Sequence, residues 1–450
     1  MMTLFEVCSV LNIPCTHDIE LTGVCIDSRL VKPGNLFVAI IGERLDGHAY
    51  IADAVAHGAA AIICSKAGQP GSAVELIVPD TLQALAAIAT YHRRKFSCQV
   101  IALTGSNGKT TVKEMIAAIL PQPAHATHGN YNNHIGAPLC VLELQAEHRY
   151  AVFELGANHP GEIMHTVAIV QPQVTLINNI APAHIAGFGS IDGVARAKGE
   201  IHQGLAAGGI AVINDDDGYA DFWPPLLKNH KTIHFSQVKP ADIYARAIRF
   251  NQQGCAQFML VVPQGEAMVS LQVPGAHNVS NALAAAACTS ALDIGLADIV
   301  AGLNQFAGVP GRMTFLAGKH QSLIIDDTYN ANLRSVLSGL EVLANYRGKR
   351  IFVFGDMGEL GAWTEQHHQE VGVAARNHGI DVLMTCGTHS KYTAAAFGAS
   401  ARHYQNKTEL VDDLLAELNE ATTVLVKGSR SAAMEKVVHQ LTDDMAVTID

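Results

Sequence analysis

Short unbroken apolar runs, each followed by a polar loop and then by a segment with helical periodicity, recur along most of this 450-residue chain. The clearest examples are QVIALT (99–104), YAVFEL (150–155) and VTLINNI (174–180). A strand that is apolar on both faces has to be covered on both sides, which is typical of parallel sheets flanked by helices. The sequence therefore predicts an α/β fold.

The rhythm of these runs divides the chain into three blocks, and a chain of this length is expected to form about three domains. We predict a small N-terminal α/β domain (1–97), a central P-loop mononucleotide-binding parallel sheet (98–310) and a C-terminal Rossmann-like sheet (311–450). The stretch FAGVPGRM (306–313) is rich in Gly and Pro and is interpreted as a hinge. Within the central block, residues 243–273 have a hairpin-like pattern that predicts a small appended sheet.

Composition excludes several classes of protein. The net charge of −11, from 30 basic and 41 acidic residues, is unlike that of proteins that bind nucleic acid or anionic membranes. The nine cysteines contain no C-x-x-C pair, so no disulfide framework is expected and a reducing cytoplasm is the expected compartment. The most apolar segment (281–303) is interrupted by Asp293 and Asp298, which predicts buried helices and no membrane insertion. No heptads or apolar stripe call for a partner chain, so a monomer is expected.

The strand at 99–104 runs into the turn TGSNGKTT, after which a helical pattern begins. Backbone N–H groups at such a turn, here those of residues 106–110, are expected to face phosphate oxygens. We expect Lys109 to neutralise the β- and γ-phosphates of a nucleotide and Thr110 to bind Mg²⁺. The usual pattern has a glycine where Leu103 stands, so a tight turn with a solvated lysine is the alternative. The predicted nucleotide-binding turn is Gly105, Ser106, Asn107, Gly108, Lys109, Thr110 and Thr111.

Three further candidates lie in the central block. Glu154 ends the strand YAVFEL, where a carboxylate near a phosphate loop suits Mg²⁺, the alternative being a solvated acid at a strand end. His184 lies in the loop after VTLINNI, and a lone loop histidine is more often structural. Lys198 lies in the middle of a predicted helix, where a lysine is usually solvated.

Amide side chains are concentrated in two other segments. THGNYNNHIGAP (127–138) carries Asn130, Asn132 and Asn133, which favours a lining for a polar substrate over an ordinary surface loop. GAHNVSNALAAAA (275–287) is interpreted as a loop with Asn278, Ser280 or Asn281 capping an Ala-rich helix.

The third block offers two polar loops after buried strands. DDTYNAN (326–332) could bind ribose hydroxyls, an amine or a carboxylate, and the alternative is a helix cap. Lys427, Ser429 and Arg430 suit an anionic group. In open α/β sheets ligands bind at such carboxyl ends of strands.

Together these segments resemble the Mur ligase family, the ATP-dependent amide-forming enzymes of bacterial peptidoglycan synthesis. TGSNGKTT is similar to the phosphate loop of that family, which typically lacks the leading glycine. The resemblance covers essentially the whole chain, and it is greatest to the members that join D-alanyl-D-alanine to UDP-N-acetylmuramoyl-tripeptide (UDP-MurNAc-tripeptide). The strings that carry it are DSRLVKPGNLFVAIIGERLDGHAY, GNYNNHIGAP, FELGANHPGEI, ARAKGEI, DDTYNAN and GDMGELG.

The resemblance implies a catalytic set and its cofactors, which are ATP and two Mg²⁺ ions. Lys109, Glu154, His184 and Lys198 are the implied catalytic residues, and Thr110 joins the last three as a metal ligand. Lys198 is implied to be carbamylated, which turns a cation into an anion with two acceptor oxygens. ATP contacts are implied for Asn278, Asn281, Arg312 and Asp327, the last two only after the third domain closes.

The substrates, UDP-MurNAc-tripeptide and D-Ala-D-Ala, are implied to bind elsewhere on the chain. The uridine diphosphate end is assigned to Ser28, Arg29, Asp46, Gly47 and His48. Asn330 and Asn332 are placed near the incoming dipeptide, and Asn130, Asn132 and Asn133 remain in the expected substrate lining.

The implied reaction activates the tripeptide carboxylate as an acyl phosphate, which the dipeptide amine then attacks, releasing ADP and phosphate. One alternative is another amide ligase on the same scaffold, such as a diaminopimelate- or lysine-adding relative or a folylpolyglutamate synthetase. Others are a P-loop switch or kinase without ligase activity, and a sugar-nucleotide binding protein.

Overall fold

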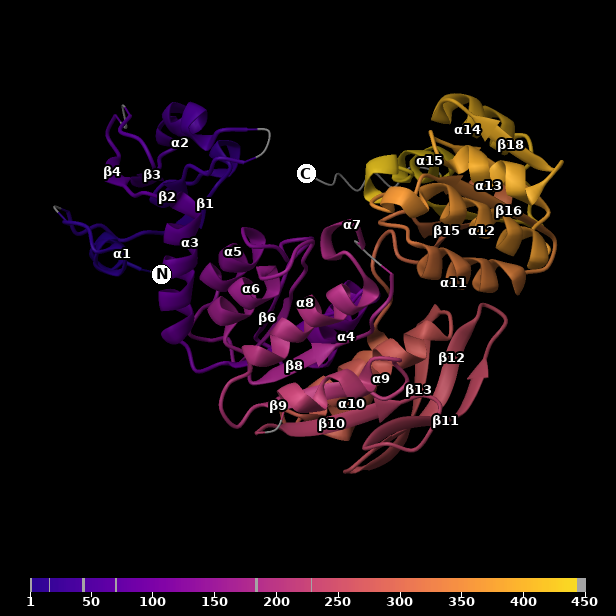
Figure 1. Cartoon of the computed structure of the whole chain (residues 1–450), viewed down its shortest axis with the longest axis horizontal. Helices are drawn as coiled ribbons and strands as arrows, with labels where there is room; N and C mark the ends of the chain where they lie inside the picture. Colours follow the sequence, from indigo (N-terminus) through magenta and orange to yellow (C-terminus); the bar gives the residue numbers. More distant parts are fainter. Residues whose placement is uncertain are drawn as a thin grey trace.

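The computed structural model describes residues 2–15, 17–42, 45–68, 71–182, 185–227 and 229–442. These residues form three sheets with flanking helices, and Figure 1 shows the three following one another along the chain from indigo to yellow. Parallel pairs predominate in all three, so the predicted α/β class is confirmed. Among the described helices, none combines the length and the apolar composition needed to cross a bilayer.

The first sheet has four parallel strands in the order β1-β2-β3-β4. Its central strands are fully buried, which agrees with their unbroken apolar sequence. The elements are α1 (Leu4–Leu11), β1 (Gly23–Cys25), η1 (Ser28–Leu30), β2 (Asn35–Val38), η2 (Gly47–Tyr50), α2 (Ile51–Ala56), β3 (Ala61–Cys64), β4 (Val74–Ile77) and α3 (Thr81–Arg94).

The second sheet has nine strands in the order β13-β12-β11-β10-β9-β8-β5-β7-β6. Its first half comprises β5 (Gln99–Thr104), α4 (Lys109–Ile119), β6 (Ala124–Ala126), α5 (Gly136–Leu142), β7 (Tyr150–Glu154), α6 (Glu162–Val170), β8 (Val174–Ile177), α7 (Ile185–Phe188) and α8 (Ile191–Gln203). Its second half comprises β9 (Ile210–Asn214), η3 (Ala220–Phe222), η4 (Pro224–Leu226), β10 (Lys231–Ser236), β11 (Ile243–Phe250), β12 (Cys255–Val262), β13 (Gly265–Pro274), α9 (His277–Ser290) and α10 (Leu296–Gln305).

The prediction of a separate appended sheet over 243–273 is wrong. Strand β10 pairs in parallel with both β9 and β11, so the antiparallel strands β12 and β13 extend the central sheet. Local alternation of apolar residues predicts strands but does not specify which strand each one pairs with.

The segment 281–303 forms the helices α9 and α10, which confirms the prediction of helices in place of a membrane span. The predicted cap of α9 is wrong, because the helix already begins at His277 and Ala276 occupies the N-cap position. The Asn278 amide donates instead to the Pro274 carbonyl at 2.7 Å, which places Asn278 and Asn281 inside the helix and buried.

The third sheet has the order β14-β15-β19-β16-β17-β18, with only β14 antiparallel to its neighbour. Strand-loop-helix units begin at β15, β16, β17 and β19. The elements are β14 (Thr314–Ala317), η5 (Lys319–Gln321), β15 (Leu323–Asp327), α11 (Leu333–Ala344), β16 (Lys349–Gly355), η6 (Gly361–Trp363), α12 (Thr364–Asn377), β17 (Val382–Cys386), α13 (Ser390–Phe397), β18 (Ala401–Tyr404), α14 (Lys407–Leu415), β19 (Thr422–Lys427), η7 (Arg430–Ala432) and α15 (Glu435–Leu441).

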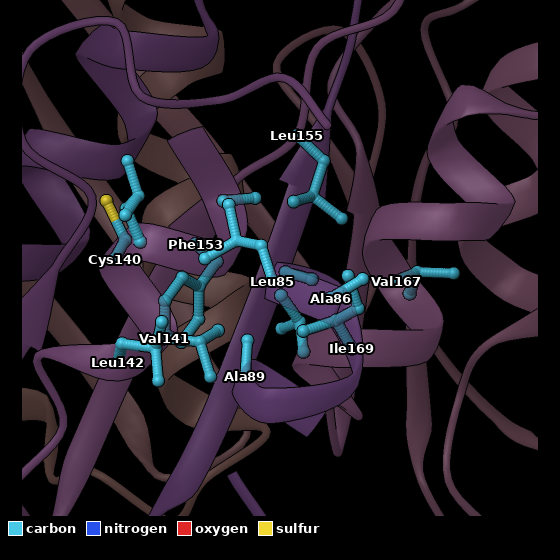
Figure 2. Close-up of a cluster of buried hydrophobic side chains, with 14 of the residues drawn as sticks. Leu85, Ala86, Ala89, Cys140, Val141, Leu142, Phe153, Leu155, Val167 and Ile169 are labelled. Carbon is cyan, nitrogen blue, oxygen red and sulfur yellow. The ribbon is translucent and has the colours of Figure 1, made fainter. Parts of the chain in front are cut away.

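Helix α3 connects the first two sheets through one hydrophobic core. Figure 2 shows Leu85, Ala86 and Ala89 of α3 among side chains of α5, β7 and α6, including Phe153 and Val167. The core runs on to Leu36 and Val38 of β2 without a break. Burial of this much apolar surface makes α3 a rigid support between the first sheet and the central one.

Candidate active site

The carboxyl ends of the second and third sheets border a cavity of about 670 Å³. Both sheets contribute predicted site residues to its wall, in keeping with the rule that ligands bind at this edge of an α/β sheet. The predicted residues in the wall are Ser106, Asn107, Gly108, Lys109, Thr111, Asn130, Asn132, Asn133, Glu154, Lys198, Asn278, Asn281, Arg312, Asp327, Asn330 and Asn332.

The turn between β5 and α4 has the geometry of a tight backbone cradle. Gly108 has φ +76°, and a Cβ atom there would lie 2.5 Å from Asn281 Oδ1 and 2.7 Å from Asn178 Nδ2, so only glycine fits. Lys109 Nζ folds back and donates to the Gly105 carbonyl at 2.9 Å. Burial lowers the pKa of Lys109, and a phosphate beside it would raise that pKa again by favouring the charged form.

Two of the five backbone N–H groups expected to face phosphate already donate hydrogen bonds within the protein, so that part of the prediction is wrong. The Ser106 N–H donates to the Asn179 carbonyl at 2.9 Å, and the Asn107 N–H donates to Asn179 Oδ1 at 2.9 Å. Asn178 Nδ2 donates to the Asn107 carbonyl at 2.9 Å and to Asn281 Oδ1 at 3.0 Å. Asn178 and Asn179 therefore hold the turn, and the signal for them was the amide pair closing VTLINNI.

Glu154 lies beneath this turn and is buried. Its carboxylate accepts from Thr110 Oγ1 at 2.7 Å and from Asn132 Nδ2 at 2.7 Å, while its backbone N–H donates to Thr127 Oγ1 at 3.1 Å. The alternative of a solvated strand-end acid is therefore wrong. A hydroxyl and a carboxylate oxygen this close together, at the wall of a polar cavity, form a donor set of the kind that Mg²⁺ prefers.

Lys198 is buried on α8 and lines the same cavity, so the expectation of a solvated lysine is wrong. Burial lowers its pKa far below the usual range, the charge of Lys109 lowers it further, and Glu154 acts in the opposite direction. A lowered pKa favours the uncharged, nucleophilic form of a lysine amine. His184 lies outside the described residues.

The third sheet already touches the phosphate turn. Arg312 Nη2 donates to Thr110 Oγ1 at 2.8 Å, and its guanidinium lies 4.1 Å from the centre of the Tyr329 ring. Asn332 Nδ2 donates to Asn107 Oδ1 at 2.6 Å, and the same side chain caps α11 by accepting from the Ser335 N–H. Asn332 therefore both caps α11 and contacts the phosphate turn.

Asp327 and Asn330 form a second small network on the third sheet. Buried Lys427 donates to Asp327 Oδ2 at 2.5 Å and to the Asn330 carbonyl at 2.9 Å. Asp327 is therefore charge-paired at the end of β15, and the Asn330 carboxamide accepts from the Ala331 N–H at 2.8 Å. Lys427 and Asp327 therefore place one positive and one negative group in the cavity wall.

The residues assigned to the uridine diphosphate end form a separate group at the carboxyl edge of the first sheet. Asp46 accepts from the backbone N–H of His48 at 3.0 Å and contacts its Nδ1 at 2.6 Å. Gly47 fits because a Cβ there would lie 2.8 Å from the Ile40 backbone nitrogen. Ser28 is buried, and Arg29 is exposed and paired with Asp27 at 2.6 Å.

Several polar residues of the cavity wall are not among the predicted site residues. Asn214 donates to the Asn178 carbonyl at 2.8 Å, and Asp217 accepts from the Ile180 N–H at 2.8 Å. Both follow the end of β9, where a polar run (NDDD, 214–217) could have been singled out. Asp216, His277 and Tyr329 also line the cavity.

Comparison with known proteins identifies the family. Three family models match in order along the chain: the Mur ligase family catalytic domain over residues 20–100, the Mur ligase middle domain over 103–289 and the Mur ligase glutamate ligase domain over 311–430. The UDP-N-acetylmuramoyl-tripeptide–D-alanyl-D-alanine ligase of Escherichia coli (strain K12) is 43% identical over 449 residues, covering 98% of this chain and 99% of that protein. The chain belongs to the Mur ligase family.

Other Mur ligases agree in sequence and fold. The ligase of the same name from Haemophilus influenzae is 41% identical and covers 95% of each chain. The crystal structure of MurF from Acinetobacter baumannii superposes with a TM-score of 0.90, 37% identity and 98% coverage of each chain. MurF from Thermotoga maritima in complex with ADP gives a TM-score of 0.81 at 27% identity, covering 93% of this chain and 96% of that one.

Proposed function

We propose that the protein joins D-alanyl-D-alanine to UDP-N-acetylmuramoyl-tripeptide with the hydrolysis of ATP to ADP and phosphate, completing the cytoplasmic pentapeptide precursor of peptidoglycan. The observation that carries the proposal is similarity along the whole chain to ligases of that name, including 43% identity to the Escherichia coli protein. The cavity supports it chemically, because it brings Lys109, Glu154 and Lys198 of one sheet to Asp327 and Asn330 of the other.

In the first step, one oxygen of the tripeptide carboxylate attacks the γ-phosphorus of ATP. The bond between that phosphorus and the oxygen bridging it to the β-phosphorus breaks, which releases ADP. This chemistry asks the protein mainly for position and neutralisation of charge. Lys109 is placed to supply the positive charge, and the N-terminal end of α4 adds favourable backbone dipoles. The Gly105 carbonyl holds the Lys109 ammonium until a phosphate replaces it.

Magnesium, when bound, would neutralise the phosphate oxygens and help hold them in line. Thr110 and Glu154 are the described residues that would hold it, because their oxygens lie 2.7 Å apart at the cavity wall. The Thr110 hydroxyl now accepts from Arg312, so that contact has to be given up when a cation binds there. Arg312 is then free to turn its guanidinium to the nucleotide.

Lys198 enters the proposal as a carbamate, as the family resemblance implies. Its lowered pKa supports this, because only an uncharged amine attacks CO₂. The product is an anion with two acceptor oxygens, which could serve a second magnesium ion together with His184.

In the second step, the amine of D-Ala-D-Ala attacks the carbonyl carbon of the acyl phosphate, and the carbon–oxygen bond to the phosphate breaks. An acyl phosphate is also attacked by water, so the site has to be closed during this step. The third sheet contributes Asn330 and Asn332 to the cavity wall near the phosphate turn, which is where the proposal places the dipeptide. Closure about the 306–312 hinge would shield the intermediate.

Small-angle scattering tests this closure. The radius of gyration is expected to fall when a nonhydrolysable ATP analogue and the tripeptide substrate saturate the protein. An unchanged radius at saturation would count against movement of the third sheet.

The uridine diphosphate end is proposed to bind at Ser28, Arg29, Asp46, Gly47 and His48. These loops follow two adjacent parallel strands of the first sheet, an edge suited to ligand binding. We further propose that the enzyme works as a monomer in the cytoplasm, where ATP and the nucleotide precursor occur.

Mass spectrometry of the product tests the function directly. UDP-MurNAc-tripeptide, ATP and D-Ala-D-Ala are expected to yield UDP-MurNAc-pentapeptide and one ADP for each peptide bond formed. Release of ADP that does not depend on the dipeptide would favour a simple nucleotide hydrolase. Product formation with a single amino acid in place of the dipeptide would favour a different amide ligase of the same scaffold.

A further inference from the structure

A cluster of three metal-binding side chains lies beside the catalytic cavity and has no part in the proposed reaction. The Nδ1 of His128, the Sγ of Cys140 and a carboxylate oxygen of Glu143 all lie within 4.8 Å of one another. Across the described ranges of the chain, no other trio of His, Cys, Asp or Glu side chains meets this condition.

The backbone explains why these three side chains meet. Cys140 lies in the last turn of α5 and Glu143 is its C-cap residue, so a spacing of three places both on one face of the helix. His128 comes from the loop after β6, and its Nδ1 lies 3.8 Å from Cys140 Sγ. Figure 2 shows Cys140 at the edge of the apolar cluster that includes Val141 and Phe153.

The distances between these atoms match those of ligands around one tetrahedral ion. Zinc–nitrogen bonds of about 2.0–2.1 Å, zinc–oxygen bonds of about 2.0–2.2 Å and zinc–sulfur bonds of about 2.3 Å separate neighbouring ligand atoms by roughly 3.3–3.6 Å. The separation of His128 Nδ1 from Glu143 Oε2 is 3.3 Å, and its separation from Cys140 Sγ is 3.8 Å. These two separations are within a few tenths of an ångström of the tetrahedral values, and all three atoms lie within 4.8 Å of one another.

We propose that His128, Cys140 and Glu143 bind one Zn²⁺ ion, with water as the fourth ligand. The side chains of His128 and Glu143 are 47% and 50% exposed, which leaves a path for the ion and room for the water. A combination of imidazole, thiolate and carboxylate is a zinc set and is poorly suited to magnesium, which prefers oxygen alone. The competing explanation is a plain ion pair between His128 and Glu143.

Binding requires the Cys140 thiol to lose its proton, because the thiolate is the ligand. Burial raises the pKa of Cys140 to about 12, so the thiol is protonated in the metal-free protein. One proton therefore leaves for solvent as the zinc–sulfur bond forms. Calorimetry in buffers of different ionisation enthalpy measures that release.

The ion would join two segments that frame the active site. The residue before His128 is Thr127, whose carbonyl accepts from Lys113 at 2.6 Å and whose hydroxyl accepts from the Glu154 N–H at 3.1 Å. The same loop continues to Asn132, which donates to Glu154. Zinc at this site would fix the loop to α5 and slow hydrogen exchange of its backbone amides.

Cobalt is the probe for the test, because Co²⁺ in a thiolate-containing tetrahedral site absorbs in the visible and near-ultraviolet ranges. We expect the full-length, chelator-treated protein to bind one Co²⁺ with a sulfur charge-transfer band, and Zn²⁺ to abolish the band by displacement. His128→Gln, Glu143→Gln and Cys140→Ser are each expected to weaken Co²⁺ binding at least tenfold. The matched controls are His134→Gln, an exposed histidine of the same loop, and Cys15→Ser, a free cysteine elsewhere.

The proposal is overturned if saturating Co²⁺ gives no sulfur band, or if His128→Gln binds as tightly as the wild type. It is also overturned if a control variant loses the band to the same extent. Should Cys140→Ser fail to fold, the exposed His128→Gln and Glu143→Gln variants still decide the matter. Because these readouts need neither ATP nor peptide, their outcome is independent of the proposed ligase activity.

Discussion

The central sheet and the first sheet each carry polar site residues at one edge, and the two edges have the same architecture but different environments. We define the catalytic edge by Lys109, Glu154 and Lys198, and the handle edge by Asp46 and His48. Both follow the carboxyl ends of parallel strands. Glu154 of the catalytic edge is held by Thr110 and Asn132, which are distant in sequence. Asp46 and His48 contact each other at a separation of two residues, and His48 also accepts from the Ser65 N–H.

The difference teaches what each edge can do. Burial around Lys109 and Lys198 lowers the pKa of both amines. A phosphate or CO₂ bound beside them therefore interacts with groups that little water surrounds. Such groups can stabilise charge that develops during a reaction. The exposed, locally capped loops of the handle edge offer preformed hydrogen bonds, which contribute to affinity with little effect on the chemical step. The following predictions test this contrast.

The largest effect is expected from Lys109→Ala. Loss of the charge that faces the transferred phosphoryl group should lower kcat by about a thousandfold. Steady-state release of ADP measures it, and Lys239→Ala, at an exposed lysine of the same sheet, is the matched control. A variant that folds normally and keeps a tenth of wild-type turnover would contradict the proposed role of Lys109 in the reaction.

The second effect concerns Lys198, where Lys198→Ala should lower kcat by about a hundredfold, the upper range for loss of a group that supports a metal site. Activity of the wild type should also fall in CO₂-free buffer and return with bicarbonate, because a carbamate forms reversibly from CO₂ and the lowered pKa of Lys198 favours the uncharged amine that attacks it. Arg196→Ala, at an exposed position of the same helix, is the control. If bicarbonate has no effect and carbon-13 labelling finds no carbamate, the carbamylation proposal fails.

A smaller effect is expected at the handle edge. Asp46→Asn weakens one charged hydrogen bond to His48, so KM for the UDP-linked substrate should rise by roughly three- to tenfold with kcat unchanged. Asp53→Asn on the exposed face of α2 is the control. A fall in kcat of the size expected for Lys198→Ala would erase the distinction between the two edges.

The last prediction concerns stability, at His202 on the helix that carries Lys198. Burial lowers the pKa of His202 to about 3, so the folded state stays unprotonated while the unfolded state takes up a proton near pH 6.5. Stability should therefore fall as the pH drops below 6.5 towards 3, by up to about 1.4 kcal/mol per pH unit from this group.

Denaturant titrations of the wild type and His202→Gln between pH 7 and 5 measure this contribution. Trp223, whose ring centre lies 5.9 Å from that of His202, is a local fluorescence probe in a Trp363→Phe background. His57→Gln in the first sheet is the control. Parallel pH profiles for wild type and His202→Gln would contradict the assignment.

The strand-loop-helix rhythm was sufficient to predict the fold class, because apolar runs and turn residues are local signals. It also marked Lys109 and Glu154, since Lys109 begins the helix after the turn that follows β5 and Glu154 ends β7. The amides Asn178 and Asn179 were missed because their partners lie about 70 residues away in the phosphate turn. The extension of the central sheet by β11–β13 was missed for a different reason, since local alternation predicts strands but not which strand each one pairs with.

Lys198 shows the same limit of prediction from local sequence. Helical periodicity placed it correctly on a helix, but only the packed structure shows that the side chain is buried beside Lys109. Its chemistry therefore came from the family resemblance and not from spacing. Propensity and pattern act within a few residues, whereas pKa depends on everything packed around the group.

The central claim is that the γ-phosphoryl group of ATP passes to the carboxylate of the tripeptide before the peptide bond forms. The most direct measurement uses UDP-MurNAc-tripeptide with its terminal carboxylate labelled with oxygen-18, together with ATP and D-Ala-D-Ala. If the acyl phosphate forms, each phosphate released carries one labelled oxygen, because the carbon–oxygen bond breaks on the carbonyl side. Unlabelled phosphate accompanying labelled pentapeptide would contradict the account.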